Sequence, residues 1–154
     1  ELASADATND AFALDFIEGV GCDYLVQVNP TSPFTSPNDL LAVTTKIKSG
    51  LYSAVHTVKE ERIEGLFLGR PLNFDTTKKM PPSQELQPIY LFTSSIMAWD
   101  AHIFRKNMDR TGCAVYGGDG EIFYHAISGY GVVDIDYEED FSIAEVIAKS
   151  LKNS

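Results

Sequence analysis

Hydrophobic residues recur with helical spacing near the start of the chain and then give way to a short strand-like run. Apolar side chains fall every three or four positions over residues 8–20, which predicts an amphipathic helix that ends near Gly19 or Gly21. Residues 23–28 form a short apolar and β-branched run, which predicts a buried strand. Two prolines and two hydroxyl residues within 29–34 then predict a rigid loop.

A second helix and strand follow this loop. Ser36 and Pro37 have the residue types of an N-cap and a first helical position, and the helix is expected to run to about Ser49. Residues 52–58 predict the next strand. Because strands alternate with helices, the pattern predicts an α/β domain with a largely parallel sheet, in which ligands lie beyond the carboxyl ends of the strands.

Residues 59–90 break this alternation. Beyond a short possible strand at 66–68, the segment is polar and contains four prolines. A segment of this length without regular structure is usually functional or paired with something in a compact domain. We therefore interpret residues 59–90 as an extended arm of a single domain, residues 1–154, and expect the arm to pack on a second subunit.

The remaining third of the chain returns to regular patterns. The turn chemistry of Gly117–Gly120 predicts a β-hairpin rather than a phosphate-binding loop, since the cluster carries Asp119 in place of lysine and no helix follows it. The other expected elements are a strand at 91–98, a helix from Asp100 to about Asn107, hairpin strands at 114–116 and 121–127, and a helix at 137–152.

Composition and charge limit the possible partners. The chain carries a net charge of −10, which argues against nonspecific binding to nucleic acid or anionic membranes, although an anionic small substrate remains compatible if a metal ion supplies positive charge. No apolar run approaches the length of a membrane-spanning helix. Two cysteines are too few for a disulfide framework or a zinc site, which points to a reducing, cytoplasmic location.

Two aspartates stand at the end of the apolar run that begins at Gly131. In a strand, Asp134 and Asp136 would point to the same face, where paired carboxylates suit Mg²⁺ and a phosphate-bearing substrate. A competing interpretation takes Asp136 and Glu139 as a helix N-cap with its capping-box partner. The spacing alone leaves both interpretations open.

Three segments in this order resemble the acylneuraminate cytidylyltransferase family, the synthetases of CMP-sialic acids and related CMP-activated nonulosonates. They are Glu1–Asp6, the strand and Pro-Thr-Ser-Pro loop of residues 23–34, and the Asp-Ile-Asp segment with its acidic helix start at 133–145. Residues 71–75 and 83–86 look like the dimerisation arm of that family. The resemblance covers nearly the whole chain.

The resemblance implies a Rossmann-like nucleotidyltransferase fold and a homodimer whose arms reach over each other's active sites. The reaction would be attack by the anomeric hydroxyl of a nonulosonic acid on the α-phosphate of CTP, with release of pyrophosphate. Asp134 and Asp136 would hold Mg²⁺ and act in catalysis. The implied substrate-binding residues are Asn29, Thr31 and Ser32 in the loop and Gln84 in the arm.

The chain departs from the family pattern at several places. The family normally starts with a strand and a loop bearing Gly, Lys and Arg that cradles the triphosphate, and nothing corresponding precedes Glu1. We therefore expect the N-terminal strands and the nucleotide-binding part to be missing, and the chain alone to bind CTP weakly or not at all. Asn29 replaces the usual Gln, Ser83 replaces an arm arginine, and residues 93–97 replace Asn-Gly-Ala-Ile-Tyr.

Two other functions remain open at the sequence level. The altered positions are compatible with a non-catalytic domain that keeps the fold for dimerisation or partner binding. A glycosyltransferase using the aspartate pair is disfavoured because the pair lies just before the final helix. His56 and His125 alternate with apolar residues in predicted strands, which indicates solvated or hydrogen-bonded structural roles.

Overall fold

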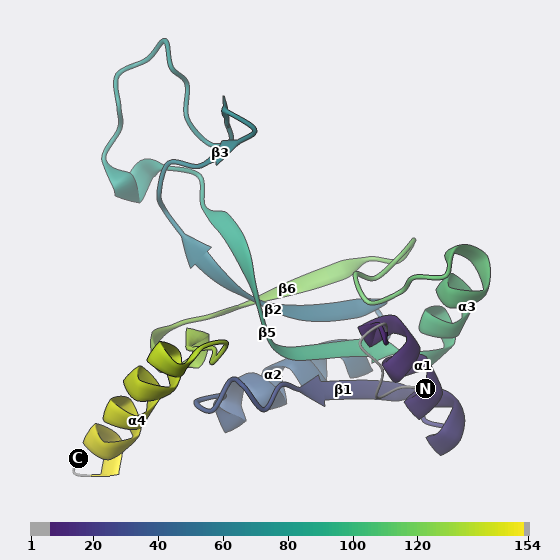
Figure 1. Ribbon diagram of the computed structural model, residues 1–154. Helices are drawn as coiled ribbons and strands as arrows, with labels where there is room; N and C mark the ends of the chain where they lie inside the picture. The colour runs from purple at the N-terminus through teal and green to yellow at the C-terminus, as the bar shows by residue number, and fades with distance from the viewer. Residues whose placement is uncertain (1–6, 153–154) are drawn as a thin grey trace.

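A computed structural model describes residues 7–152 of the chain. Helices and strands alternate along these residues. Figure 1 shows a central sheet with helices around it and a long projection. The elements are α1 (Asn9–Val20), β1 (Tyr24–Val28), α2 (Pro37–Lys48), β2 (Ala54–Glu61), β3 (Leu66–Phe67), β4 (Arg70–Pro71), η1 (Ser83–Glu85), β5 (Ile89–Asp100), α3 (Ala101–Thr111), β6 (Ile122–Ile127), η2 (Gly129–Val132) and α4 (Glu138–Lys152).

The central sheet has four strands in the order β1-β5-β2-β6. β5 pairs antiparallel with both β1 and β2, while β2 and β6 pair in parallel. Three of these strands therefore run in one direction and β5 runs against them. This confirms the predicted α/β class, with the qualification that β5 separates β1 from β2 and leaves one parallel neighbouring pair.

Local signals place the helices where the sequence predicts them. The Thr8 hydroxyl accepts a hydrogen bond from the Ala11 amide and caps α1, which ends at Gly21 with a φ of 69°. A left-handed residue at this position is typical of glycine, because any side chain would be strained there. Ser36 caps α2, and its Oγ accepts a hydrogen bond from the Asp39 amide at 3.0 Å.

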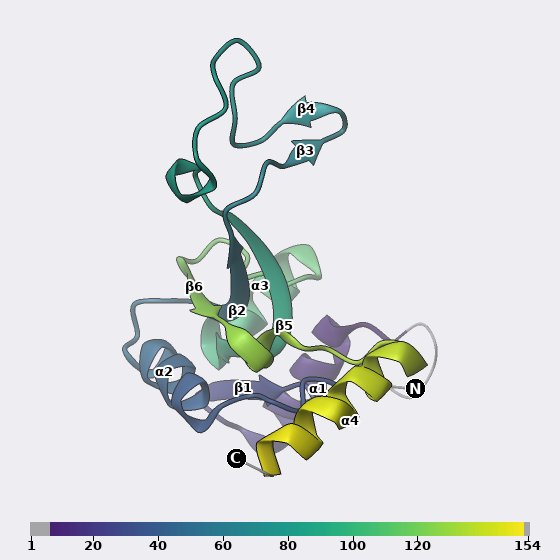
Figure 2. The ribbon, with the colours of Figure 1, turned by 90° about the vertical axis from the view of Figure 1, so that its left-hand side faces the viewer.

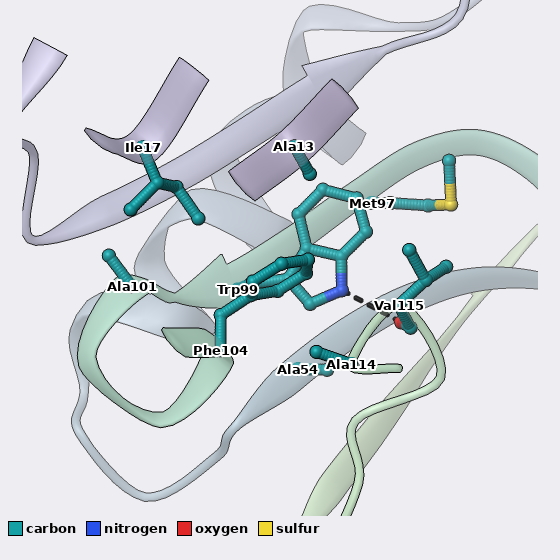
Figure 3. Close-up of a cluster of buried hydrophobic side chains, with 9 residues drawn as sticks. All are labelled: Ala13, Ile17, Ala54, Met97, Trp99, Ala101, Phe104, Ala114 and Val115. Carbon is teal, nitrogen blue, oxygen red and sulfur yellow. Dashed lines mark hydrogen bonds between the residues drawn. The ribbon is translucent and has the colours of Figure 1, made fainter. Parts of the chain in front are cut away.

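Two buried clusters lie against the sheet. Trp99 is fully buried between α1, α3 and the turn after α3, and its indole Nε1 donates a 2.8 Å hydrogen bond to the Val115 carbonyl (Figure 3). The bond satisfies the one polar atom of a large buried side chain, so the burial carries no desolvation penalty. A smaller cluster joins α2 to β2 and β5 through Val43, Ile47, Val55, Ile96 and Ala98.

The arm, residues 59–90, leaves the sheet between β2 and β5 (Figure 2). It contains the two-stranded β3–β4 ribbon and the turn η1. Asn73 holds its base, since the side-chain oxygen accepts from the Gly65 amide while Nδ2 donates to the carbonyls of Ile63 and Gln87. The excursion predicted from the prolines is therefore an ordered loop with its own hydrogen bonds.

Two predicted strands are wrong. Residues 114–116 form turns instead of a hairpin strand, and β6 pairs in parallel with β2. Residues 131–136 are also no strand, because η2 is followed by an irregular segment that leads into α4. The predicted short strand at 66–68 is present as β3, although it ends at Phe67.

None of the helices among residues 7–152 is long and apolar enough to cross a membrane.

Candidate functional site

The loop after β1 is tied to the sheet at its first residue. The Asn29 amide donates a 2.9 Å hydrogen bond to the Ser95 carbonyl of β5, and the Ser32 amide donates to the Asn29 carbonyl at 3.1 Å. Thr35 closes the turn through its hydroxyl, which donates to the Ser32 carbonyl. This loop lies at the carboxyl end of β1, the position where ligands bind in α/β folds.

The segment before α4 returns to this loop. The Ile135 amide donates a 3.0 Å hydrogen bond to the Thr31 carbonyl. Thr31 in turn donates from its hydroxyl to Asp134 Oδ1 at 2.5 Å, and the Ser32 hydroxyl contributes a longer contact of 3.4 Å. The structure therefore brings together Thr31, Ser32 and Asp134, which are about a hundred residues apart in the sequence.

Asp134 has one engaged oxygen and one open oxygen. Oδ1 also accepts from the Ile135 amide at 3.2 Å, whereas no hydrogen bond to Oδ2 occurs within residues 7–152. The open Oδ2 is thus a hard oxygen ligand of the kind that Mg²⁺ takes.

Asp136 is exposed and does not cap α4 through its side chain. Instead Asp140, in the first turn of α4, reaches back to the residues before the helix, because its Oδ2 accepts from the amides of Asp136 and Tyr137 at 3.1 and 3.0 Å. The alternative of a capping box with Glu139 is therefore wrong, and the Asp136 carboxylate stays available to a ligand. Within residues 7–152 no three His, Cys, Asp or Glu side chains form a ready cation site.

A bulge in β5 adjoins the loop. The pairing with β2 shifts between His56 and Val58, and Ser94 adopts a φ of 53°. The Thr57 hydroxyl takes the place of a backbone partner in the ladder, since it accepts from the Ile96 amide and contacts the Ile96 carbonyl, each at 3.0 Å. The hydroxyls of Thr93 and Ser95 join it at 3.0 and 2.9 Å.

One departure from the family pattern lies in this bulge. Ser94 stands where the resembling family commonly carries glycine, a residue that adopts positive φ without strain. The left-handed conformation is kept here with a serine, and the Thr57 hydroxyl compensates the disrupted ladder. The sequence pattern contains the residue types of this cluster but gives no sign that they meet.

Gln84 is not brought to the same place. It lies exposed in η1 on the arm, which projects from the sheet away from α4 (Figures 1 and 2), and its carbonyl accepts a 3.5 Å hydrogen bond from Arg62. Within one chain the arm residue and the Asp134 loop are therefore apart. A role for Gln84 at this loop would require the arm of a second copy.

A groove of about 600 Å³ lies in the arm itself. It is open to solvent and remote from Asp134, so we give it no part in the chemistry of the loop. One wall contains Glu64, whose Oε1 is buried without a hydrogen-bond partner among the residues that the structure describes. The other wall residues include Phe74, Lys78, Lys79, Met80 and Leu86.

The two predicted structural histidines differ in environment. His125 Nε2 lies 2.9 Å from Asp39 Oδ1, and the Ser36 hydroxyl donates to Asp39 Oδ2, so β6 is linked to the start of α2. His56 is buried among Phe92 and Trp99, and within residues 7–152 neither ring nitrogen makes a hydrogen bond of good geometry. Hydrogen bonding is confirmed for His125 and is wrong for His56.

Burial shifts the titration of His56. Desolvation of the charged ring lowers its pKa from 6.5 to about 4, and the nearby Val115 backbone opposes the shift only in part. The imidazole is therefore neutral at physiological pH and acts as a buried aromatic ring.

Comparison with known proteins gives one informative result. No protein-family model matches the chain, and no curated protein is significantly similar in sequence. Among solved structures, it is similar to 4-diphosphocytidyl-2C-methyl-D-erythritol synthase from Anaerococcus prevotii, with a TM-score of 0.63 over 94% of this chain and 68% of that chain. At 12% sequence identity the likeness shows the fold alone. The predicted Rossmann-like α/β fold is thereby confirmed.

Proposed function

We propose that this chain belongs to a cytidylyltransferase that transfers CMP from CTP to a nonulosonic, sialic-acid-like sugar and releases pyrophosphate. The observation that carries the proposal is the meeting of Thr31, Ser32 and Asp134 at the carboxyl end of β1. These residues belong to the two segments that resemble acylneuraminate cytidylyltransferases. The structural neighbour, itself named for a diphosphocytidyl product, supports the same class of chemistry.

The loop supplies positioning in this proposal. The hydroxyls of Thr31 and Ser32 hold the Asp134 carboxylate through Oδ1, and Oδ2 accepts no hydrogen bond within residues 7–152. Asp134 Oδ2 and the exposed Asp136 carboxylate would hold Mg²⁺, which offsets charge on the phosphates when it is bound. Asn29 would contact the acceptor sugar through its side chain, since its backbone amide is already bonded to β5.

A homodimer would complete the site. The arm is the electrically neutral part of a strongly acidic chain, with five basic and five acidic residues against a net charge of −10 overall. It also exposes large apolar side chains in and next to the β3–β4 ribbon, including Leu66, Phe67, Leu68 and Leu72. Contact through the arms would bury these side chains without bringing the acidic bodies together, and would carry Gln84 to the partner's loop.

The test is pyrophosphate release from CTP and Mg²⁺ by the natural gene product that contains this sequence. We expect turnover with a nonulosonic acid in the panel and none with a 2C-methyl-D-erythritol phosphate, the acceptor type suggested by the neighbour's name. Turnover with only the erythritol phosphate would support the cytidylyltransferase activity but exclude a nonulosonic acid as the acceptor. No turnover with either acceptor would count against catalysis.

The alternative is a non-catalytic domain that keeps the fold for dimerisation or partner binding. It is favoured by the hydrogen bonds that already occupy Asp134 Oδ1 and by Gln84 lying apart from the loop within one chain. Binding of Mg²⁺ separates the two functions, because a structural domain has no need of it. Isothermal titration of the natural gene product with MgCl₂, in the presence and absence of CTP, measures that binding.

A further inference from the structure

The tip of the β3–β4 ribbon combines backbone strain with almost full exposure. β3 and β4 are joined by two residues, Leu68 and Gly69, which have φ values of 49° and 77°. Positive φ at both central residues is required by the tight hairpin turn that asparagine and glycine normally fill, and it strains a leucine. Leu68 is nevertheless 88% exposed, so little contact within residues 7–152 offsets the strain. Backbone outliers of this kind point to a functional contact.

The ribbon also presents an aromatic ring and a cation on one face. Phe67 and Arg70 lie opposite each other in the pairing of β3 with β4, so their side chains share a face of the ribbon. Both side chains are exposed. The ribbon therefore projects an apolar tip, made of Phe67 and Leu68, with a guanidinium beside it.

The groove in the same arm has a complementary character. It has a volume of about 600 Å³, and its walls come from residues 73–76, 78–81 and 85–87 and from Glu64. Its apolar lining consists of Phe74, Met80, Pro81 and Leu86. Sites that enclose a bound group have volumes of roughly 300–1,000 Å³ and a mainly apolar lining. The groove is thus large enough for the two apolar side chains of a ribbon tip, and within residues 7–152 it stays unfilled.

The charges of the arm match these two surfaces. Three of its five basic residues pair with three of its five acidic residues, as Lys59–Glu61, Arg62–Glu60 and Lys78–Asp75. The other four, which form no ion pair within residues 7–152, are Arg70, Lys79, Glu64 and Glu85. Lys79 and both glutamates line the groove, which leaves the groove with one negative charge in excess. Arg70 on the ribbon carries the opposite charge.

We propose that the β3–β4 ribbon tip of each chain inserts into the arm groove of a second copy. Phe67 and Leu68 of the tip would pack on the apolar lining, and the partner's Arg70 would meet Glu64 and Glu85. A second copy is the occupant because tip and groove belong to one segment, so a two-fold rotation fills both grooves at once. Repulsion disfavours contact through the bodies, which carry the net charge of −10, whereas the arm is neutral. The inference rests on the homodimer of the proposed function and identifies the surfaces that meet.

The experiment tests reciprocity with two variants of the natural gene product that contains this sequence. Arg70→Glu reverses the charge of the tip, and Glu64→Lys combined with Glu85→Lys reverses the charge of the groove. Each variant alone opposes like charges in both contacts of its homodimer, so self-association should weaken by at least about tenfold. A mixture of the two restores opposite charges in both contacts and should form a heterodimer with close to the parent affinity. Analytical ultracentrifugation measures the homodimers, and native mass spectrometry identifies the heterodimer.

Further variants separate contact from folding. Because Glu64 is partly buried, Glu64→Gln with Glu85→Lys replaces the double lysine variant should circular dichroism show that variant unfolded. Leu68→Asn gives the turn its preferred residue, so it should keep or raise the melting temperature of the monomer. It should still weaken self-association by at least about tenfold, because the apolar tip is lost. Leu51→Asn makes the same change at an exposed position of the body and should leave association unchanged.

Three results would contradict the proposed contact. A parent that stays monomeric at every concentration would remove the contact, and turnover by that monomer would leave the proposed activity intact. Weakened homodimers of both charge variants with no heterodimer in the mixture would place the tip against a surface other than the groove. Unchanged association of Arg70→Glu or Leu68→Asn would exclude the tip as the contact. A heterodimer that forms but releases no pyrophosphate would support the contact and count against the activity alone.

Discussion

At the scale of single residues, substitutions at Asp134 and Asp136 distinguish an effect on stability from an effect on turnover. Asp134→Asn keeps an oxygen for the donors from Thr31 and Ile135, so we expect stability within about 1 kcal/mol of the parent and loss of CMP-sugar formation. Asp136→Asn should act in the same way because the residue is exposed. Urea unfolding and pyrophosphate release on the natural gene product measure the two effects.

Asp134→Ala is the matched variant for this comparison. It leaves the Thr31 hydroxyl and the Ile135 amide without an acceptor, and we expect a loss of about 1–3 kcal/mol of stability in addition to lost turnover. Unchanged turnover in Asp134→Asn or Asp136→Asn would remove that carboxylate from the chemistry. Equal stability of the Asn and Ala variants at position 134 would mean that the loop contact contributes nothing.

His56 makes stability depend on pH. Its folded-state pKa of about 4 lies below the 6.5 of an unfolded chain, so the unfolded state binds a proton first as the pH falls. The contribution of the neutral ring is complete above pH 6.5 and is lost progressively towards pH 4, by about 3 kcal/mol in total. Urea unfolding at several pH values in this window measures the loss.

His56→Phe provides the control, because phenylalanine fills the same aromatic site without titrating. The difference in unfolding free energy between the parent and His56→Phe should change across the window, while carboxylate titrations cancel in that difference. A difference that is independent of pH would show that His56 is not buried as a neutral ring. The sequence could not reveal this buried site, because alternation with apolar residues does not say whether one face or both faces of β2 are covered.

At the scale of elements, the β5 bulge depends on one hydroxyl. Thr57→Val keeps the shape of a fully buried side chain but removes the acceptor of the Ile96 amide. We expect a loss of about 1–3 kcal/mol, since a buried donor is left unsatisfied. Thr57→Ser keeps the hydroxyl and should recover most of that loss. Thermal unfolding of both variants checks the prediction, and equal melting temperatures for Val and Ser would contradict it.

Elements with capping signals were predictable, whereas elements that depend on a distant partner were not. Ser36, Pro37 and Gly21 mark helix ends by local chemistry, and the structure confirms both helices. Asp134 and Asp136 alternate with apolar neighbours as in a strand, yet the Ile135 amide bonds to the carbonyl of a loop residue, Thr31, and within residues 7–152 the segment joins no ladder. A period of two shows which residues share a face and says nothing about whether a neighbouring strand exists.

The same reasoning applies to the glycine turn. Gly117 has a φ of 94° and its carbonyl accepts from the side chains of Ser53 and Asn107, so the chain folds against α3 instead of returning along β6. The predicted turn is present and the predicted hairpin is absent. The resemblance, rather than any local pattern, placed the Pro-Thr-Ser-Pro loop and the Asp-Ile-Asp segment in the same site.

At the scale of the whole molecule, the arm should control association. Leu68 is 88% exposed and Phe67 is 64% exposed in its β3–β4 ribbon, in a segment with balanced charge. Phe67→Asp combined with Leu68→Asp would place two carboxylates in the contact, and burying them unpaired is costly. We therefore expect the parent to sediment as a dimer and the double variant as a monomer, measured by analytical ultracentrifugation over a range of concentrations.

The control for this prediction is Leu41→Asp, which changes an equally apolar residue on α2, 66% exposed and outside the arm. It should leave the dimer intact, because the added charge lies on the body and not at the contact. If the parent stays monomeric, Gln84 cannot act at the Asp134 loop, because the two lie apart within one chain. A dimer broken by Leu41→Asp and kept by the arm variant would move the interface to the α2 side of the body, and the substrate-binding role of Gln84 would be lost with it.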